Sequence, residues 1–427
     1  MATEINTNAL NSLAINGGPK ARVDPWPERG QLGLEEKEAV DALFDESIAT
    51  GRPFDYDGPT EESFCQEFAQ FMGGGFADAV SSGTSAIYVA LRALDLEPFT
   101  EVVVGALTDA GGMMPVPLIN CIPVVADTAP GRFAPGPEEI SEVISPLTSA
   151  IIVPHIAGDP ADMEGILRVA RRHGIPVIED CSQAHGARLN GKLVGSFGDI
   201  AAFSTMSGKH MNTGGQGGVV YTKSESLYQA SRRASDRGKP FFMQPGDTNQ
   251  AASMNLNLND LAAAIGRVQL KKLPDLVARR RDFVTKLTEG IYDSDLQAVS
   301  IPPSVPGAES SHWWWALKLD AEKLTCDEAT FCEALSAEGI LASRMGWNIL
   351  PHKMEWYKSR RVFGSSGYPW ASPLYEGDPD RQFPCPNATS AVEGHVQLTV
   401  NENWGDHEVA DIVTALKKVE SAYLKHP

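Results

Sequence analysis

Residues 150–187 read AIIVPHIAGDPADMEGILRVARRHGIPVIEDCSQAHGA, and this stretch decides the fold. Its two apolar runs, at 150–153 and 176–180, have the length and composition of buried strands. Between them, residues 164–173 repeat apolar side chains at helical spacing. Because strands joined by a helix usually lie parallel in one sheet, the stretch predicts two parallel strands with a crossover helix.

Similar runs of strand length occur on both sides of this unit, at 101–104, 122–126, 200–203 and 217–221. Residues 84–94 have the apolar spacing of a further helix. This alternation predicts an α/β domain with a mostly parallel sheet covered by helices on both faces. In such sheets, ligands bind beyond the carboxyl ends of the strands.

The last third of the chain has a different pattern. Residues 260–291 predict one long helix, which we expect to break near Pro274 because proline lacks the N–H that a helix interior needs. The run of tryptophans at 313–315 suits the half-buried strand of a smaller domain better than a binding surface, and residues 406–425 predict a closing helix. We therefore expect an N-terminal arm with the start of the small domain (1–35), a large domain (36–300) and a small C-terminal domain (301–427).

The composition limits the class of partner. Lysines and arginines number 36 against 55 aspartates and glutamates, which gives a net charge of −19. A field of that sign repels phosphates, so we expect neither a nucleic acid nor an anionic membrane as partner. The six cysteines lack C-x-x-C spacing, and no signal peptide or membrane-length apolar run is visible. We expect a cytoplasmic protein.

The turn Ser82-Gly83-Thr84 precedes a predicted helix. The first N–H groups of a helix attract anions, and a glycine allows a phosphate to approach closely. Small residues are also common at ordinary strand-to-helix turns. The turn alone leaves both interpretations open.

An acidic pair, Glu179-Asp180, ends one predicted strand. An aspartate there could be a helix cap, a metal ligand or the partner of a protonated ring nitrogen. No histidines or carboxylates with metal-ligand spacing accompany it, so we expect no metal site.

Lys209 stands in a run of small residues that follows another predicted strand. Partial desolvation lowers the pKa of a lysine and makes its amine a nucleophile toward a carbonyl carbon. The glycine turn at 213–218 matches neither the dinucleotide nor the P-loop motif. An aldehyde cofactor with a phosphate and a pyridine ring requires a lysine that bonds its aldehyde, an acid that keeps its ring nitrogen protonated, and a turn that holds its phosphate. The sequence offers a candidate for each of these.

Six segments in this order resemble one family: DGPTEESFCQEFAQF (57–71), SSGTSAIYVALRAL (81–94), HIAGDPADM (155–163), HGIPVIEDCSQAHGA (173–187), GSFGDIAAFS (195–204) with Lys209, and NDLAAAIGRVQLKKL (259–273). The chain resembles the DegT/DnrJ/EryC1/StrS sugar aminotransferases, which are pyridoxal-phosphate enzymes of fold type I. The resemblance implies a mostly parallel seven-stranded sheet sandwiched by helices, and a smaller α+β C-terminal domain. It also implies a homodimer with shared active sites.

The resemblance also assigns roles by motif position. The catalytic residues are implied to be Lys209, which bonds to the aldehyde of pyridoxal 5'-phosphate, and Asp180, which pairs with its pyridine nitrogen. Gln183 would contact the phenolic oxygen of the cofactor. The phosphate contacts are implied to be Gly83, Thr84, Ser204 and, from the neighbouring subunit, Asn255.

The chain departs from the family pattern at several positions. Asp109 stands where an aromatic residue usually covers the cofactor ring, so it either bonds the cofactor or substrate or caps the following helix. Gln216 replaces a common glutamate. Asn257 replaces a frequent arginine, and this loss of charge weakens the expectation of a nucleotide diphosphate substrate.

Two histidines are candidate substrate residues. In some relatives a histidine replaces the lysine and the enzyme dehydrates its substrate, but here the spacing from Ser204 puts Lys209 at that position and leaves His210 as its neighbour. Packing is the alternative role for His210. His352 follows Leu350-Pro351, a position that lies near the substrate in the family.

The resemblance implies an aminotransferase that moves an amino group from L-glutamate or L-glutamine to a keto-sugar or keto-cyclitol, in amino sugar or aminocyclitol biosynthesis. The N-terminal stretch AINGGPKARVDPWP (14–27) favours the cyclitol branch. The alternatives are a nucleotide-linked keto-sugar substrate, a pyridoxal-phosphate-dependent sugar dehydratase, and a non-catalytic regulator that binds the cofactor.

Overall fold

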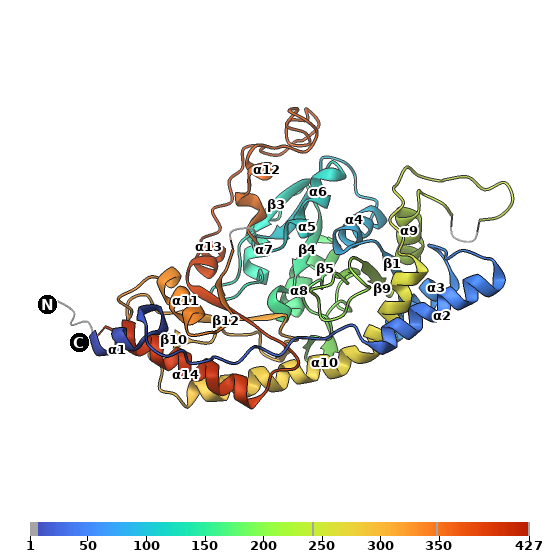
Figure 1. The fold of residues 1–427 in the computed structure, drawn as a ribbon. Helices are drawn as coiled ribbons and strands as arrows, with labels where there is room; N and C mark the ends of the chain where they lie inside the picture. Colours follow the sequence, from blue (N-terminus) through green and yellow to red (C-terminus); the bar gives the residue numbers. More distant parts are fainter. Residues whose placement is uncertain (1–6, 241–242, 347–348, 426–427) are drawn as a thin grey trace.

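The computed structural model of the chain describes residues 7–240, 243–346 and 349–425. A central seven-stranded sheet has helices on both faces, and one long helix connects it to a smaller sheet (Figure 1). The strand order of the large sheet is β1-β9-β8-β5-β4-β2-β3. Its strands are β1 (Phe76–Val80), β2 (Glu101–Gly105), β3 (Ile122–Ala126), β4 (Thr148–Pro154), β5 (Val177–Asp180), β8 (Ile200–Ser204) and β9 (Gly218–Thr222).

The predicted α/β class and mostly parallel sheet are confirmed. Strands β3, β2, β4, β5 and β8 run parallel, whereas β9 is antiparallel to both β8 and β1. The sequence patterns missed β1 because Asp78 interrupts its apolar run. Asp78 is fully buried, and Arg232 Nη1 donates to its Oδ1 over 2.8 Å.

Successive residues of a strand face opposite sides of the sheet, so each strand contributes to two cores. Ile200 and Ala202 of β8 pack in one core with α4, whereas Ala201 and Phe203 pack in another with α3 and α10. The helices around the large sheet are α2 (Leu34–Thr50), α3 (Pro59–Phe71), α4 (Gly83–Ala93), α5 (Ala110–Met113), α6 (Pro115–Leu118), α7 (Pro137–Val143), α8 (Met163–His173), α9 (Glu225–Ser235) and α10 (Asp260–Tyr292).

The expected break at Pro274 is wrong, because α10 continues through it from Asp260 to Tyr292. A proline inside a helix removes one backbone hydrogen bond, and tertiary packing compensates for such a loss. Leu273 and Leu276, on either side, are both buried. The unbroken helix extends from the large sheet to the smaller one (Figure 1).

The smaller sheet is antiparallel, with the strand order β10-β12-β14-β13. Its elements are β10 (Val299–Ser300), β12 (Trp314–Leu319), α11 (Glu328–Ala337), β13 (Ala342–Arg344), β14 (His395–Thr399) and α14 (Asp406–Tyr423). The predicted strand and closing helix are therefore present. Leu13, which lies between α1 (Thr7–Ser12) and η1 (Ala14–Asn16), is buried in the same core. Because β10 pairs with β12, we propose that the domain boundary lies just before Val299.

The segment between β13 and β14 crosses back over the large sheet. Tyr357 Oη donates to the Pro123 carbonyl over 3.0 Å, and Tyr375 Oη donates to Glu101 Oε1 over 2.8 Å. This segment contains η4 (Pro351–Lys353), α12 (Glu355–Lys358) and α13 (Pro386–Glu393). A separate small sheet joins β6 (Arg188–Leu189) to β7 (Lys192–Leu193) and β11 (Ala308–Glu309).

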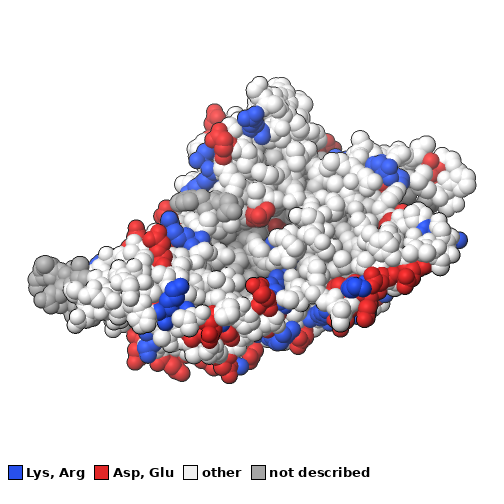
Figure 2. Space-filling model, in the orientation of Figure 1, with Lys and Arg blue, Asp and Glu red and all other residues white. Residues whose placement is uncertain are grey.

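Within the described residues, no helix has the length and apolar character needed to span a membrane. The acidic excess is visible as a strip of acidic side chains along the edge formed by α2 (Figure 2). The acidic residues of that helix are Glu35, Glu36, Glu38, Asp41, Asp45 and Glu46.

Candidate active site

A cavity of about 200 Å³ lies at the carboxyl ends of β4, β5 and β8. Polar residues that the sequence places in separate turns meet there, because parallel strands end at one edge of the sheet. The residues that line it are Ser82, Gly83, Thr84, Ile87, Thr108, Asp109, Gly111, Gly112, Pro154, His155, Ile156, Asp180, Ser182, Gln183, Ser204, Met206, Lys209 and Gln216.

Lys209 lies on the turn after β8 and is almost fully buried. Its backbone N–H donates to the Met206 carbonyl over 2.9 Å, which closes the turn. Burial lowers the pKa of Lys209 to about 8, although the carboxylates of Asp180 and Asp109 oppose this shift. About a tenth of this amine is therefore neutral and nucleophilic at pH 7, far more than for a lysine of ordinary pKa.

Asp180 is the last residue of β5, and its carboxylate lines the same cavity. The Ser182 N–H donates to its Oδ1 over 3.0 Å. Burial raises its pKa, while hydrogen bonds from Ser182 and the charge of Lys209 act in the opposite direction. A buried carboxylate at the cavity wall is suited to pair with a protonated ring nitrogen.

The amino end of α4 forms a compact cradle for an anion. A Cβ placed on Gly83 would lie only 2.6 Å from Ser204 Cβ, so only glycine fits there. The Ser82 side chain accepts from the Ser85 N–H over 3.0 Å and so caps the helix. Thr84 and Ser204 line the cavity beside this helix start, which places hydroxyl groups where a phosphate would meet the helix.

Gln183 is held by the neighbouring loop. Its Oε1 accepts from the Ala157 N–H over 2.9 Å, and the side chain is nearly fully buried. With its oxygen engaged in this bond, the amide nitrogen is the group of Gln183 that can donate to an oxygen of a bound molecule.

Asp109 combines the two roles that the sequence left open. Its Oδ1 accepts from the Gly111 N–H over 2.8 Å and caps α5, and the residue also lines the cavity. A carboxylate therefore stands where the family resemblance led us to expect an aromatic ring.

Three predicted site residues lie outside this cavity. His210 is fully buried and shares a hydrogen bond with the Ser311 carbonyl, 3.0 Å from its Nε2, which matches the packing role. His352 is also buried, and burial lowers its pKa to about 4. Asn255 is exposed on the loop after α9, and its Oδ1 accepts from Asn257 Nδ2 over 2.9 Å.

The expectation for Trp313 is wrong. Trp314 and Trp315 are buried in the domain cores, as expected, but Trp313 is only half-buried. Its ring lies 3.6 Å from Lys209 Nζ. The aromatic pattern predicted a strand that includes all three residues, whereas β12 begins at Trp314 and Trp313 precedes it, with its ring against Lys209.

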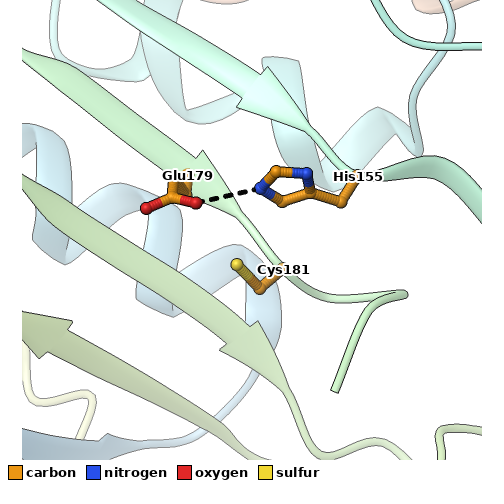
Figure 3. A group of neighbouring side chains, drawn as sticks. All are labelled: His155, Glu179 and Cys181. Atoms are coloured by element: carbon orange, nitrogen blue, oxygen red, sulfur yellow. Dashed lines mark hydrogen bonds and ion pairs between the residues drawn. The ribbon is translucent and has the colours of Figure 1, made fainter. Parts of the chain in front are cut away.

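Sequence reasoning also missed the pair beneath Asp180. Glu179 Oε2 lies 3.1 Å from His155 Nε2, with Cys181 nearby (Figure 3). His155 Nδ1 accepts from the Ala161 N–H over 3.0 Å, so the ring proton is on Nε2 and is donated to Glu179. The segment HIAGDPADM includes His155, but nothing in that segment indicated that its hydrogen-bond partner, Glu179, lies 24 residues further along the chain.

These three side chains have the donor types of a metal site, but protein groups already bond Glu179 and both ring nitrogens of His155. Glu179 accepts from the backbone N–H groups of Gly195, Phe197 and Gly198, each over 2.7 Å. Although burial opposes the change, these bonds and His155 lower the pKa of Glu179. The cluster is a rigid support for the strand ends.

The cavity suits pyridoxal phosphate in the chemistry of its donors. Lys209 offers an amine to an aldehyde, Asp180 a carboxylate to a pyridine nitrogen, and the α4 terminus a glycine cradle that a side chain would fill. Among the residues that line the cavity, Lys209 is the one lysine or arginine, and it faces the two carboxylates of Asp109 and Asp180.

Comparisons with known proteins find aminotransferases. The L-glutamine:2-deoxy-scyllo-inosose aminotransferase of Micromonospora echinospora is 32% identical over 327 residues, which are 73% of this chain and 76% of that protein. The L-glutamine:scyllo-inosose aminotransferase of Streptomyces griseus is 29% identical over 96% of this chain and 97% of its own. A crystal structure of an aminotransferase from Psychrobacter cryohalolentis matches with a TM-score of 0.77 at 26% identity, over 92% of this chain and 98% of that one.

The sequence model of one family covers most of the chain, from residue 35 to residue 417. This match and the relatives above establish what the fold and the cavity indicated. The chain belongs to the DegT/DnrJ/EryC1/StrS aminotransferase family and is a transaminase with the fold of type I pyridoxal-phosphate enzymes.

Proposed function

We propose that the protein uses pyridoxal 5'-phosphate to transfer an amino group from L-glutamine or L-glutamate to a keto-cyclitol. The observation that carries the proposal is the placement of Lys209, Asp180 and the α4 terminus in one cavity. The two relatives described above, whose names specify L-glutamine and an inosose, support this donor and this class of acceptor.

The bound cofactor would supply an electron sink for the charge that develops when the α-proton of the amino donor is removed. The chain supplies the base and the charge partner. Lys209 Nζ takes that α-proton, because its pKa of about 8 leaves a share of neutral amine near neutral pH. Asp180 holds a proton at the ring nitrogen through its buried carboxylate.

The charge of the cavity favours an acceptor without a diphosphate. The lysine that is required for the chemistry is the one lysine or arginine among the residues that line the cavity, so these residues offer no second lysine or arginine to clamp two phosphates. Asn257, where relatives often have arginine, pairs instead with Asn255. A neutral polyol ketone needs hydroxyl partners, which Asp109 and Gln216 at the cavity wall provide.

We also propose that the enzyme is a homodimer in which Asn255 enters the cavity of the partner subunit. Its exposed position, and its absence from the residues that line the cavity of its own chain, support this arrangement. Asn255 does not contribute to the cavity within one chain, although the family motif associates it with the cofactor phosphate.

The test is a panel of ketones with L-glutamine as donor and mass spectrometry of the amine product. We expect amination of scyllo-inosose or 2-deoxy-scyllo-inosose, and no product with Lys209→Ala. Amination of a dTDP-linked keto-sugar alone would replace the cyclitol proposal with the nucleotide-linked alternative. Loss of water from the substrate without amination would point to the dehydratase.

A further inference from the structure

Trp313 contacts the catalytic lysine from the side of the smaller sheet. Its ring centroid lies 3.6 Å from Lys209 Nζ, well within the range of a cation–π interaction. An aromatic face attracts the charged form of an amine and orients it at the same time.

Trp313 also holds the turn that carries the lysine. Its indole N–H donates to the Gly208 carbonyl over 2.8 Å. Its own backbone is fixed at both ends, because its N–H donates to the Ala157 carbonyl over 2.8 Å and its carbonyl accepts from Arg280 Nη1 over 3.2 Å. The ring therefore has little freedom to move away from the amine.

Other residues anchor the backbone of this turn independently. Gln31 Nε2 donates to the carbonyls of Lys209 and His210 over 2.9 and 2.8 Å, and Arg29 Nη1 donates to the Lys209 carbonyl over 3.1 Å. Loss of the Trp313 side chain would leave these bonds in place. Its effect on the amine can thus be separated from its effect on the turn.

The other ionisable groups around the amine are Asp180, Asp109 and His185. The two carboxylates favour the charged form of Lys209. Burial and the nearby charge of Lys209 lower the pKa of His185 to about 3, so this ring is neutral. Trp313 is the uncharged group that favours an ammonium at this place.

We propose that Trp313 is a positioning residue for Lys209, whose ring receives the amine as an ammonium whenever the amine is not bonded to a carbonyl carbon. The indole N–H fixes the turn, and the ring fixes the end of the side chain. The consequence for catalysis rests on the proposed function: Trp313 would return the amine of Lys209 to the same position in each catalytic cycle.

The test compares Trp313→Phe, which keeps an aromatic face, with Trp313→Leu, which does not. Neither variant can donate to Gly208, so their difference isolates the ring. The pKa of Lys209 in the full-length, cofactor-free protein would be measured from the pH dependence of reductive methylation with formaldehyde, followed by peptide mass spectrometry. Lys417, exposed on α14, serves as the internal reference.

We expect the pKa of Lys209 in the Leu variant to lie about one unit below that in the Phe variant, because loss of the ring disfavours the ammonium. In the loaded enzyme, kcat should fall in the Leu variant and recover in the Phe variant, with KM for the donor unchanged. Equal pKa values in the two variants would overturn the proposal. A pKa difference in a protein that aminates no ketone would sustain the positioning role and refute the function instead.

Discussion

His155 donates a hydrogen bond to Glu179 over 3.1 Å, and this bond joins the end of β4 to β5 directly behind Asp180. Glu179 also accepts three backbone N–H groups from the loop before β8. The buried carboxylate therefore connects the ends of β4 and β5 to the loop that precedes β8, and its loss should reduce the stability of the protein and disturb the nearby site.

Glu179→Gln should destabilise the protein by about 2–4 kcal/mol, because the new NH2 group faces N–H donors and the buried carboxylate that accepts their hydrogen bonds is lost. Urea unfolding measures this loss. The matched control is Glu46→Gln on the exposed face of α2, which should change the free energy of unfolding by less than about 0.5 kcal/mol. Equal stability of the two variants would contradict the role of Glu179.

Glu179 should also make stability depend on pH. Its pKa in the folded protein is lowered below its value in the unfolded chain, about 4.3. The stabilisation is therefore complete above that value and is lost as the pH falls through the lowered folded pKa. As the pH falls, the free energy of unfolding of the wild type should decrease more steeply than that of Glu179→Gln. Parallel stability curves would refute this.

Gly83→Ala should weaken the binding of pyridoxal phosphate by about tenfold or more, which corresponds to about 1.4 kcal/mol. Its Cβ would lie 2.6 Å from Ser204 Cβ and push the cradle open. Equilibrium titration of cofactor-free protein measures the affinity. Gly405→Ala, whose Cβ would meet no atom within 4 Å, should bind as the wild type does. Unchanged affinity of Gly83→Ala would place the phosphate elsewhere.

Asp109→Asn should lower the pKa of Lys209 below its present value of about 8, because the Asp109 carboxylate favours the ammonium form. The asparagine oxygen can still accept from Gly111, so the cap on α5 should survive. Reductive methylation across pH should show the Lys209 midpoint moving to lower pH. A midpoint that stays or rises would mean that Asp109 does not act on the amine.

Mixed dimers test the proposed sharing of active sites. Coexpression of Lys209→Ala with Asn255→Ala, followed by isolation of the mixed dimer with two affinity tags, should restore one intact site if Asn255 serves the partner subunit. Each variant alone should have weak or no activity. A mixed dimer without activity beyond that of the Asn255→Ala homodimer would place Asn255 in its own subunit or outside the site.

The sequence predicted the parallel sheet and the meeting of distant turns, because each strand and helix had a local apolar period and parallel strands end at one edge. It did not predict β1, where the buried Asp78 depends on an arginine 154 residues away. Local propensity also predicted the wrong outcome at Pro274, where packing on both sides holds the helix.

The residues that support Lys209 could not be predicted from the sequence either. Trp313 lies 105 residues from Gly208, and Arg29 lies 180 residues from the carbonyl that it binds. No periodicity or motif records such contacts, because they depend on how the smaller sheet and the N-terminal segment meet the large one. A reactive residue that a single turn presents, such as Lys209, could be predicted from the sequence. The residues that position this turn could be identified only in the folded chain.

The most direct test of the central claim is the visible absorption spectrum of the cofactor-loaded protein during titration with L-glutamine and then L-glutamate, with Lys209→Ala as control. We expect the yellow band of the lysine-bound cofactor to bleach in the wild type and not to change in this way in the variant. A yellow band that persists with both donors would contradict the assignment of Lys209 and Asp180 to amino-group transfer from these donors.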